Sequence, residues 1–139
     1  MDTSYFSDIN WLAVLVAAVA YFALGGLWYA PLFGKQWIRY HNVDMNDPDA
    51  KKGVAGIMIT TFVLILLICF GLALLIERMQ MTEAISGFRL GARTGLLFSA
   101  LAISITYLYL KKPLALHLID GLYHVVGQII AAIIICIWQ

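Results

Sequence analysis

Charged residues are scarce in this chain of 139 residues, which has nine Lys and Arg residues and eight Asp and Glu residues, or 12% in all. Soluble domains carry about 25% charged residues. The apolar fraction is 63%, and a domain this small cannot hide so much apolar surface in its own core, because small domains bury a limited share of their area. The composition therefore excludes an ordinary water-soluble domain and predicts that lipid covers much of the chain.

Cysteine is also rare, and the two cysteines, Cys69 and Cys136, each lie inside an apolar run. They form neither a CxxC motif nor a disulfide framework. The sequence lacks a nucleophile elbow, paired carboxylates and a phosphate-binding glycine loop, so we name no catalytic residue and favour a role other than catalysis. The basic residues form no stripe with aromatic residues between them, and nucleic acid is not an expected partner.

Long apolar runs with few charged residues dominate the rest of the sequence. A helix needs about 20 mostly apolar residues to cross a hydrocarbon layer about 30 Å thick, and four runs reach that length. We expect spans at about residues 10–30, 53–76, 85–110 and 115–138. The sequence therefore predicts an all-α polytopic membrane protein, a single domain over residues 1–139 with four transmembrane helices in a bundle.

The loop between the first two spans is the only sizeable segment outside the bilayer. Its residues Lys35, Trp37 and Arg39 predict a short interfacial helix, with the ring in the acyl boundary and the cations toward anionic headgroups. Further along, Asp47 before Pro48 is typical of a helix N-terminus. We therefore expect a helix to begin there.

Six of the nine Lys and Arg residues lie in the first and third loops. Cytoplasmic loops of membrane proteins carry an excess of Lys and Arg, so we expect both loops in the cytoplasm and both termini outside it. Aromatic rings prefer the headgroup level and mark the two edges of the bilayer. The predicted interface anchors are Trp11, Trp28, Tyr29, Trp37 and Trp138.

The third span has Arg89 and Arg93 only before its apolar run, Thr94–Leu110, whereas the fourth span alone has ionisable residues well inside its run. These are His117, Asp120 and His124, and with Gln128 they form one stripe about 80° wide at 100° per residue. A carboxylate within a span costs at least about 2.5–3.5 kcal/mol on insertion scales, so the stripe must face protein or water rather than hydrocarbon. Tyr21 of the first span lies at a matching depth, and we expect contact between these two helices.

Several roles for the stripe are compatible with the sequence. It can be a hydrogen-bond network that joins helices within a protomer or an oligomer, which is the interpretation we favour. It can also be a proton, ion or small polar solute site of a transporter or channel-like element. An enzyme acting on a lipid or quinone would have to use Asp120 and His124 alone. His117 and His124 lie about 10 Å apart along the axis, and we predict neither a metal site nor a cofactor.

Small residues recur every four positions in the third span, at Gly87, Gly91, Gly95 and Ser99. A face of this kind lets two helix backbones approach closely. We expect it to mediate helix packing. Together with the surplus of apolar surface, it predicts a homo-oligomer, and a larger membrane complex is a further candidate partner.

Three segments carry a resemblance to a known family: Asn10–Val14, Gly25–Gly34 with its G-x-x-W-Y-x-P-L-F-G sequence, and Leu118–His124. The chain resembles, over nearly its whole length, an uncharacterised family of small four-helix bacterial membrane proteins with a domain of unknown function. The resemblance implies a multi-pass protein of the bacterial inner membrane and supplies no activity. Together with the residues, it predicts an oligomeric structural or accessory membrane component.

Overall fold

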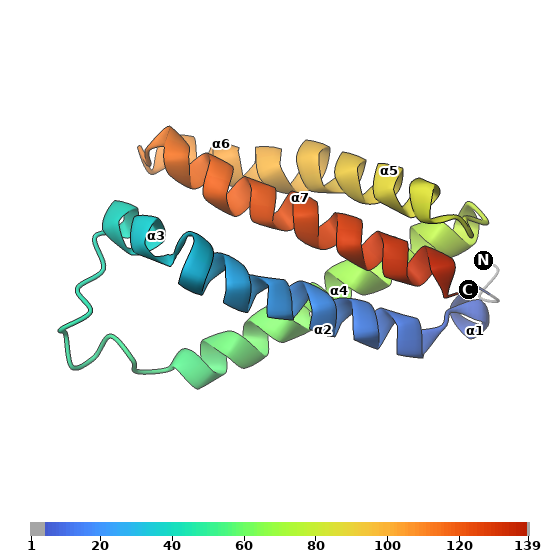
Figure 1. Ribbon diagram of the computed structural model, residues 1–139, viewed down its shortest axis with the longest axis horizontal. Helices are drawn as coiled ribbons and strands as arrows, with labels where there is room; N and C mark the ends of the chain where they lie inside the picture. The colour runs from blue at the N-terminus through green and yellow to red at the C-terminus, as the bar shows by residue number, and fades with distance from the viewer. Residues whose placement is uncertain (1–4, 139) are drawn as a thin grey trace.

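Four long helical stretches make up most of the protein, as a computed structural model that describes residues 5–138 shows (Figure 1). Each is 22 to 26 residues long and apolar enough to cross a membrane. The first is α2 (Trp11–Leu27) with the π-helix η1 (Trp28–Leu32), the second is α4 (Val54–Arg78), the third is α5 (Ala84–Thr94) with the π-helix η2 (Gly95–Ala100) and α6 (Leu101–Tyr109), and the fourth is α7 (Leu114–Ile137). This arrangement confirms the predicted all-α, four-span fold.

Two short helices accompany the spans. The helix α1 (Tyr5–Asp8) precedes α2, and α3 (Gly34–His41) forms in the first loop, where a short helix was expected. Between α1 and α2, the Asn10 side chain accepts the N–H of Ala13 at 3.1 Å and donates to the carbonyl of Trp138 at 2.7 Å. One residue therefore caps the start of α2 and joins it to the end of α7.

The expected helix start at Asp47 and Pro48 is wrong, because residues 43–53 form turns and irregular backbone and α4 begins only at Val54. The Asp47 side chain accepts the N–H of Asp49 at 2.9 Å. A local bond of this kind offers the backbone an alternative to the helix. Gly53, with φ of 74°, then turns the chain into α4.

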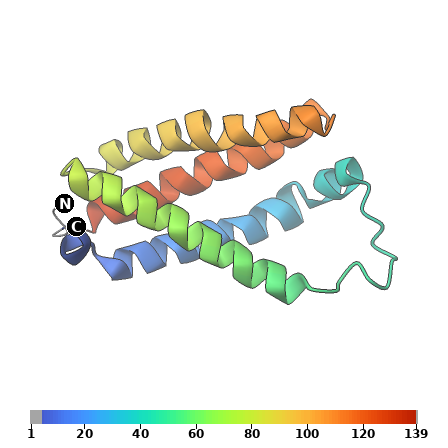
Figure 2. The ribbon, with the colours of Figure 1, turned by 180° about the vertical axis from the view of Figure 1, so that it is seen from behind.

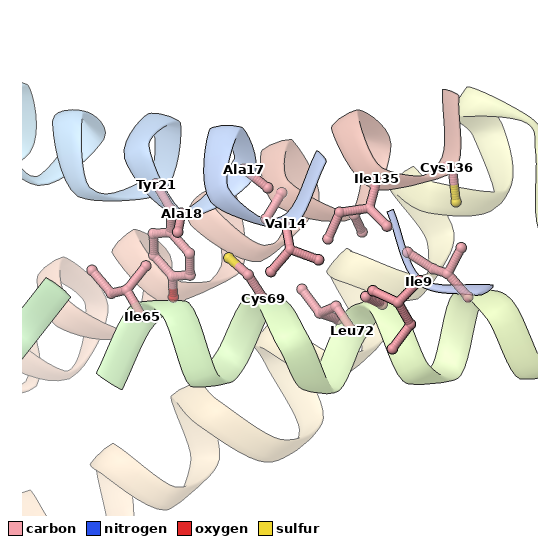
Figure 3. Packing of buried hydrophobic residues seen from close by; sticks show 14 of the residues in the cluster. Ile9, Val14, Ala17, Ala18, Tyr21, Ile65, Cys69, Leu72, Ile135 and Cys136 are labelled. Carbon is pink, nitrogen blue, oxygen red and sulfur yellow. The ribbon is translucent and has the colours of Figure 1, made fainter. Parts of the chain in front are cut away.

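The fourth helix occupies the centre of the bundle. In Figures 1 and 2, α7 lies between α2 on one side and the α5–α6 stretch on the other, while α4 crosses α2 obliquely. Buried side chains from three of these helices meet where α4 passes the others, as the labelled residues in Figure 3 show. They include Val14 and Ala17 of α2, Cys69 and Leu72 of α4, and Ile135 of α7.

The small-residue face of the third span packs on the backbone of α7. A Cβ atom added to Gly87 would lie 2.7 Å from the carbonyl oxygen of Ala132, and one added to Gly95 would lie 2.6 Å from Cα of Val125. Gly91 approaches the carbonyl oxygen of Gln128 in the same way. The face is thus occupied inside the chain, and it is no longer an argument for contact between two copies.

Candidate polar site on the fourth helix

Asp120 is the centre of the site. It lies six residues after the start of α7, about 9 Å along the axis, and its residue surface is only 6% exposed. Its Oδ1 accepts a hydrogen bond from the Tyr29 hydroxyl at 2.6 Å, and its Oδ2 accepts one from the Tyr107 hydroxyl at 2.5 Å. Because Tyr29 belongs to the first span and Tyr107 to the third, one carboxylate joins three of the four spans.

No cation neutralises this carboxylate within ion-pair distance among residues 5–138, where the one ion pair found joins Lys52 and Asp49. The two phenolic donors therefore replace the water that the carboxylate lost on burial. A buried polar group without such partners is expensive, so both tyrosines stabilise Asp120 in its place.

The next polar contact lies one turn deeper along α7. The Tyr21 hydroxyl is 2.6 Å from Nδ1 of His124, and Tyr21 is fully buried. The Tyr123 hydroxyl donates to the Tyr21 carbonyl at 3.3 Å. A Cβ atom on Gly127 would overlap the Tyr21 ring, so this glycine makes room for the ring against α7.

A third contact joins α7 to the third span. The Gln128 side chain is 3% exposed, and its Nε2 donates to Oγ of Ser99 at 2.5 Å. Ser99, which the sequence places on the helix-packing face, thus also supplies a polar partner. The side-chain bonds of Asp120, His124 and Gln128 reach the first and third spans, and none of these bonds reaches α4.

The fourth member of the stripe, His117, is set apart from the other three. It is partly exposed, and its ring faces the Tyr107 ring at a centroid distance of 5.5 Å. The Tyr107 ring also lies 6.2 Å from the His41 ring, which is in turn 4.2 Å from the Trp37 ring. These rings place α3 against the end of α6 and the beginning of α7.

His41 of α3 is the one described residue with a buried side-chain nitrogen, Nε2, that lacks a hydrogen-bond partner among residues 5–138. Burial lowers the pKa of His41, and the nearby positive charge of Lys112 lowers it further, while the Asp120 carboxylate acts in the opposite direction. A neutral imidazole is therefore favoured where α3 contacts the bundle.

The predicted interface anchors have different surroundings. Trp11 is 55% exposed and stacks on a ring of α4, and Trp138 is 43% exposed. Trp28 and Tyr29, by contrast, make side-chain hydrogen bonds to α7, since the Trp28 indole N–H donates to the Ile119 carbonyl at 2.9 Å and the Tyr29 hydroxyl donates to Asp120. Trp37 packs on His41 as described above.

Sequence reasoning found four stripe residues and Tyr21, but it did not pair Tyr29 and Tyr107 with Asp120. A usable signal was present, because both tyrosines lie near the loop ends of their spans, at the depth of Asp120. Among residues 5–138, no three His, Cys, Asp or Glu side chains lie together in a way that could hold a metal ion.

Comparison with known proteins identifies a family. The family described as "Protein of unknown function (DUF1761)" matches residues 12–136. No curated protein and no solved structure matches the chain.

Proposed function

Since the chain belongs to the DUF1761 family, whose function is unknown, we propose its role from the geometry of its own helices. The protein is a structural or accessory component of the bacterial inner membrane. Its helix α7 holds the bundle together through side-chain hydrogen bonds. The observation that carries this proposal is the Asp120 carboxylate, which accepts from Tyr29 and Tyr107 at the same time.

The energetics of helix association in lipid support this role. Lipid tails are as apolar as the helices, so packing and interhelical hydrogen bonds must hold the spans together. Each such bond contributes about 0.6 kcal/mol on average and up to about 1.7 kcal/mol. The side chains of Asp120, His124 and Gln128 make four of them. These bonds engage both oxygens of Asp120, Nδ1 of His124 and Nε2 of Gln128, so each of the three side chains already serves as a contact between helices.

The orientation is part of the proposal. The α3 loop and the α6–α7 corner lie at one end of the bundle, while the α4–α5 loop lies at the other (Figure 1). The first end has most of the Lys and Arg residues, which supports a cytoplasmic location with both termini outside. Met45→Cys should therefore resist a membrane-impermeant maleimide in intact spheroplasts, and Gln80→Cys should react. The reverse labelling pattern would invert the proposed orientation.

We also propose that the protein self-associates through a surface other than the glycine face of the third span. The beginning of α4 supports this, because every residue from Val54 to Thr60 is exposed in the single chain. A second copy or lipid must cover this apolar surface. Light scattering of the detergent-solubilised protein tests the idea, and a protein mass of one protomer would refute it.

Tyrosine variants test the structural role of Asp120. Tyr29→Phe and Tyr107→Phe should each lower stability by about 0.6–1.7 kcal/mol. The double variant leaves the buried Asp120 carboxylate without either donor, so its loss of stability should exceed the sum of the losses in the two single variants. Tyr109→Phe is the matched control on the same helix, since Tyr109 is 86% exposed. Thermal unfolding in detergent and the assembled mass are the measurements.

Asp120→Asn separates this role from transport. An amide keeps the shape but cannot accept from both tyrosines through two oxygens, so we expect a lower unfolding temperature and weaker assembly. If the variant instead unfolds and assembles like the wild type but abolishes a proton or ion flux into liposomes, the structural proposal is wrong.

A further inference from the structure

Four cations near the end of the bundle that contains α3 have no ion-pair partner among the described residues. Lys35 and Arg39 are exposed on α3, Lys111 is exposed at the corner between α6 and α7, and Lys112 beside it is half-buried. Figures 1 and 2 both show α3 next to this corner. The lowering of the His41 pKa by Lys112 agrees with this proximity.

The acidic residues of the first loop are engaged elsewhere. Asp49 pairs with Lys52 at 2.9 Å, and the carboxylates of Asp44 and Asp47 accept backbone N–H groups within the loop. In both views the loop leads away from the α6–α7 corner toward the start of α4. The four unpaired cations therefore form a positively charged surface, which we call the α3 corner.

The orientation of α3 is fixed by its aromatic side. The Trp37 ring contacts the Tyr29 ring edge-on at 6.1 Å and packs on His41, which faces Tyr107. Lys35 and Arg39 are four residues apart and so share one face of the helix. Because the aromatic side faces the bundle, this charged face points outward.

Apolar side chains lie beside the α3 corner. Leu32 at the end of η1 is 56% exposed, Leu108 of α6 is 69% exposed, and Leu114 at the start of α7 is 71% exposed. An inorganic anion would make no use of these side chains. A phospholipid would, because its acyl chains continue from the phosphate into the hydrocarbon layer.

We infer that the α3 corner is a binding surface for an anionic phospholipid. The cations of α3 and the lysines of the corner hold the phosphate-bearing headgroup, and the exposed leucines contact the acyl chains. Each Lys or Arg near an anionic membrane surface strengthens binding about fivefold. Loss of two cations should therefore weaken binding by about thirtyfold at low salt.

The experiment uses the full chain purified in a neutral detergent. Phosphatidylglycerol and phosphatidylcholine with the same acyl chains are titrated, and bound lipid is counted by native mass spectrometry. We compare the double variants K35Q/R39Q and K111Q/K112Q with R89Q/R93Q. This control removes the same charge from exposed positions on α5, at the other end of the bundle.

The wild type should prefer phosphatidylglycerol. Each α3-corner variant should bind it about thirtyfold more weakly, and the control should stay within about twofold of the wild type. Equal binding of the two lipids would overturn the inference, and so would an equal loss in the R89Q/R93Q control, since binding would then follow net charge. If millimolar inorganic phosphate competes for the α3 corner as effectively as phosphatidylglycerol does, the occupant is not a lipid and the inference is wrong.

Discussion

The small-residue face of the third span leads to a prediction about glycine-to-alanine substitutions, in which local packing decides whether the protein becomes more or less stable. Alanine normally stabilises a helix interior by about 0.5–1 kcal/mol relative to glycine. At Gly71 of α4, an added Cβ meets nothing within 4 Å, so Gly71→Ala should show that gain. At Gly87, the same atom would lie 2.7 Å from the carbonyl oxygen of Ala132 and 2.8 Å from Cα of Ile133.

The size of the effect follows from these contacts. Ordinary van der Waals contact begins at 3.4 Å, so α5 and α7 would have to separate by about 0.7 Å at Gly87. The opposing atoms belong to the backbone and cannot rotate away. Overpacking of this kind costs about 1–3 kcal/mol. The gain in helix propensity offsets only part of it, so Gly87→Ala should destabilise the protein by about 0.5–2 kcal/mol.

The free energy of unfolding of both variants is measured under the same conditions by reversible unfolding in mixed micelles, with circular dichroism as the signal. We expect changes of opposite sign, with Gly71→Ala at or above the wild type and Gly87→Ala below it. If Gly87→Ala is as stable as Gly71→Ala, the α5 backbone does not rest on α7. The small-residue face would then be free for a second copy of the chain.

Three further predictions concern the polar contacts. Tyr21→Phe removes the hydrogen bond to His124 and should lower the free energy of unfolding by about 0.6–1.7 kcal/mol. Ser99→Ala removes the acceptor of Gln128 and should have an effect of similar size. A double-mutant cycle measures the coupling energy of each pair, and a coupling energy of zero would show that the contact is absent. The pKa of His41 is lowered when α3 is packed on the bundle, so near and below its ordinary pKa of 6.5 the state with α3 detached binds more protons than the packed state. Docking of α3 should therefore be complete above that pH and weaken as the pH falls, which hydrogen exchange in α3 measures. His41→Gln should abolish this dependence, and a pH dependence that persists would assign it to another group.

The spans could be predicted from the sequence because the physical requirement is simple. A bilayer requires a helix of about 20 apolar residues, and the observed stretches agree with the runs read from the sequence. The polar stripe was visible for a similar reason, since Asp120 stands out within an apolar run. The turns of residues 43–53 were missed because local Asp side-chain bonds outweighed the helix preference of Pro48.

The partners of Asp120 were harder to predict because two spans contain π-helical turns. In a regular α-helix, Tyr107 lies about 120° from Gly95 around the axis. The π-helix η2 begins at Gly95 itself. A π turn contains one residue more than an α-helical turn, so the residues that follow it are set back around the axis by about 100°. One extra residue reduces the offset to about 20°. This change brings Tyr107 onto the face that packs on α7. No feature of the local sequence predicts the π turn.

The central place of α7 also affects how the protein is made. Chains are synthesised from the N-terminus, so Tyr21, Tyr29, Ser99 and Tyr107 enter the membrane before the helix that contains their partners. Until α7 inserts, four hydroxyl groups lack the acceptors and donors that they have in the finished bundle. A three-span intermediate therefore presents polar groups to lipid, which distinguishes it chemically from the complete protein. A chain halted before α7 should be degraded faster than the complete one in a pulse-chase experiment, and equal lifetimes would show that the bilayer tolerates these hydroxyls.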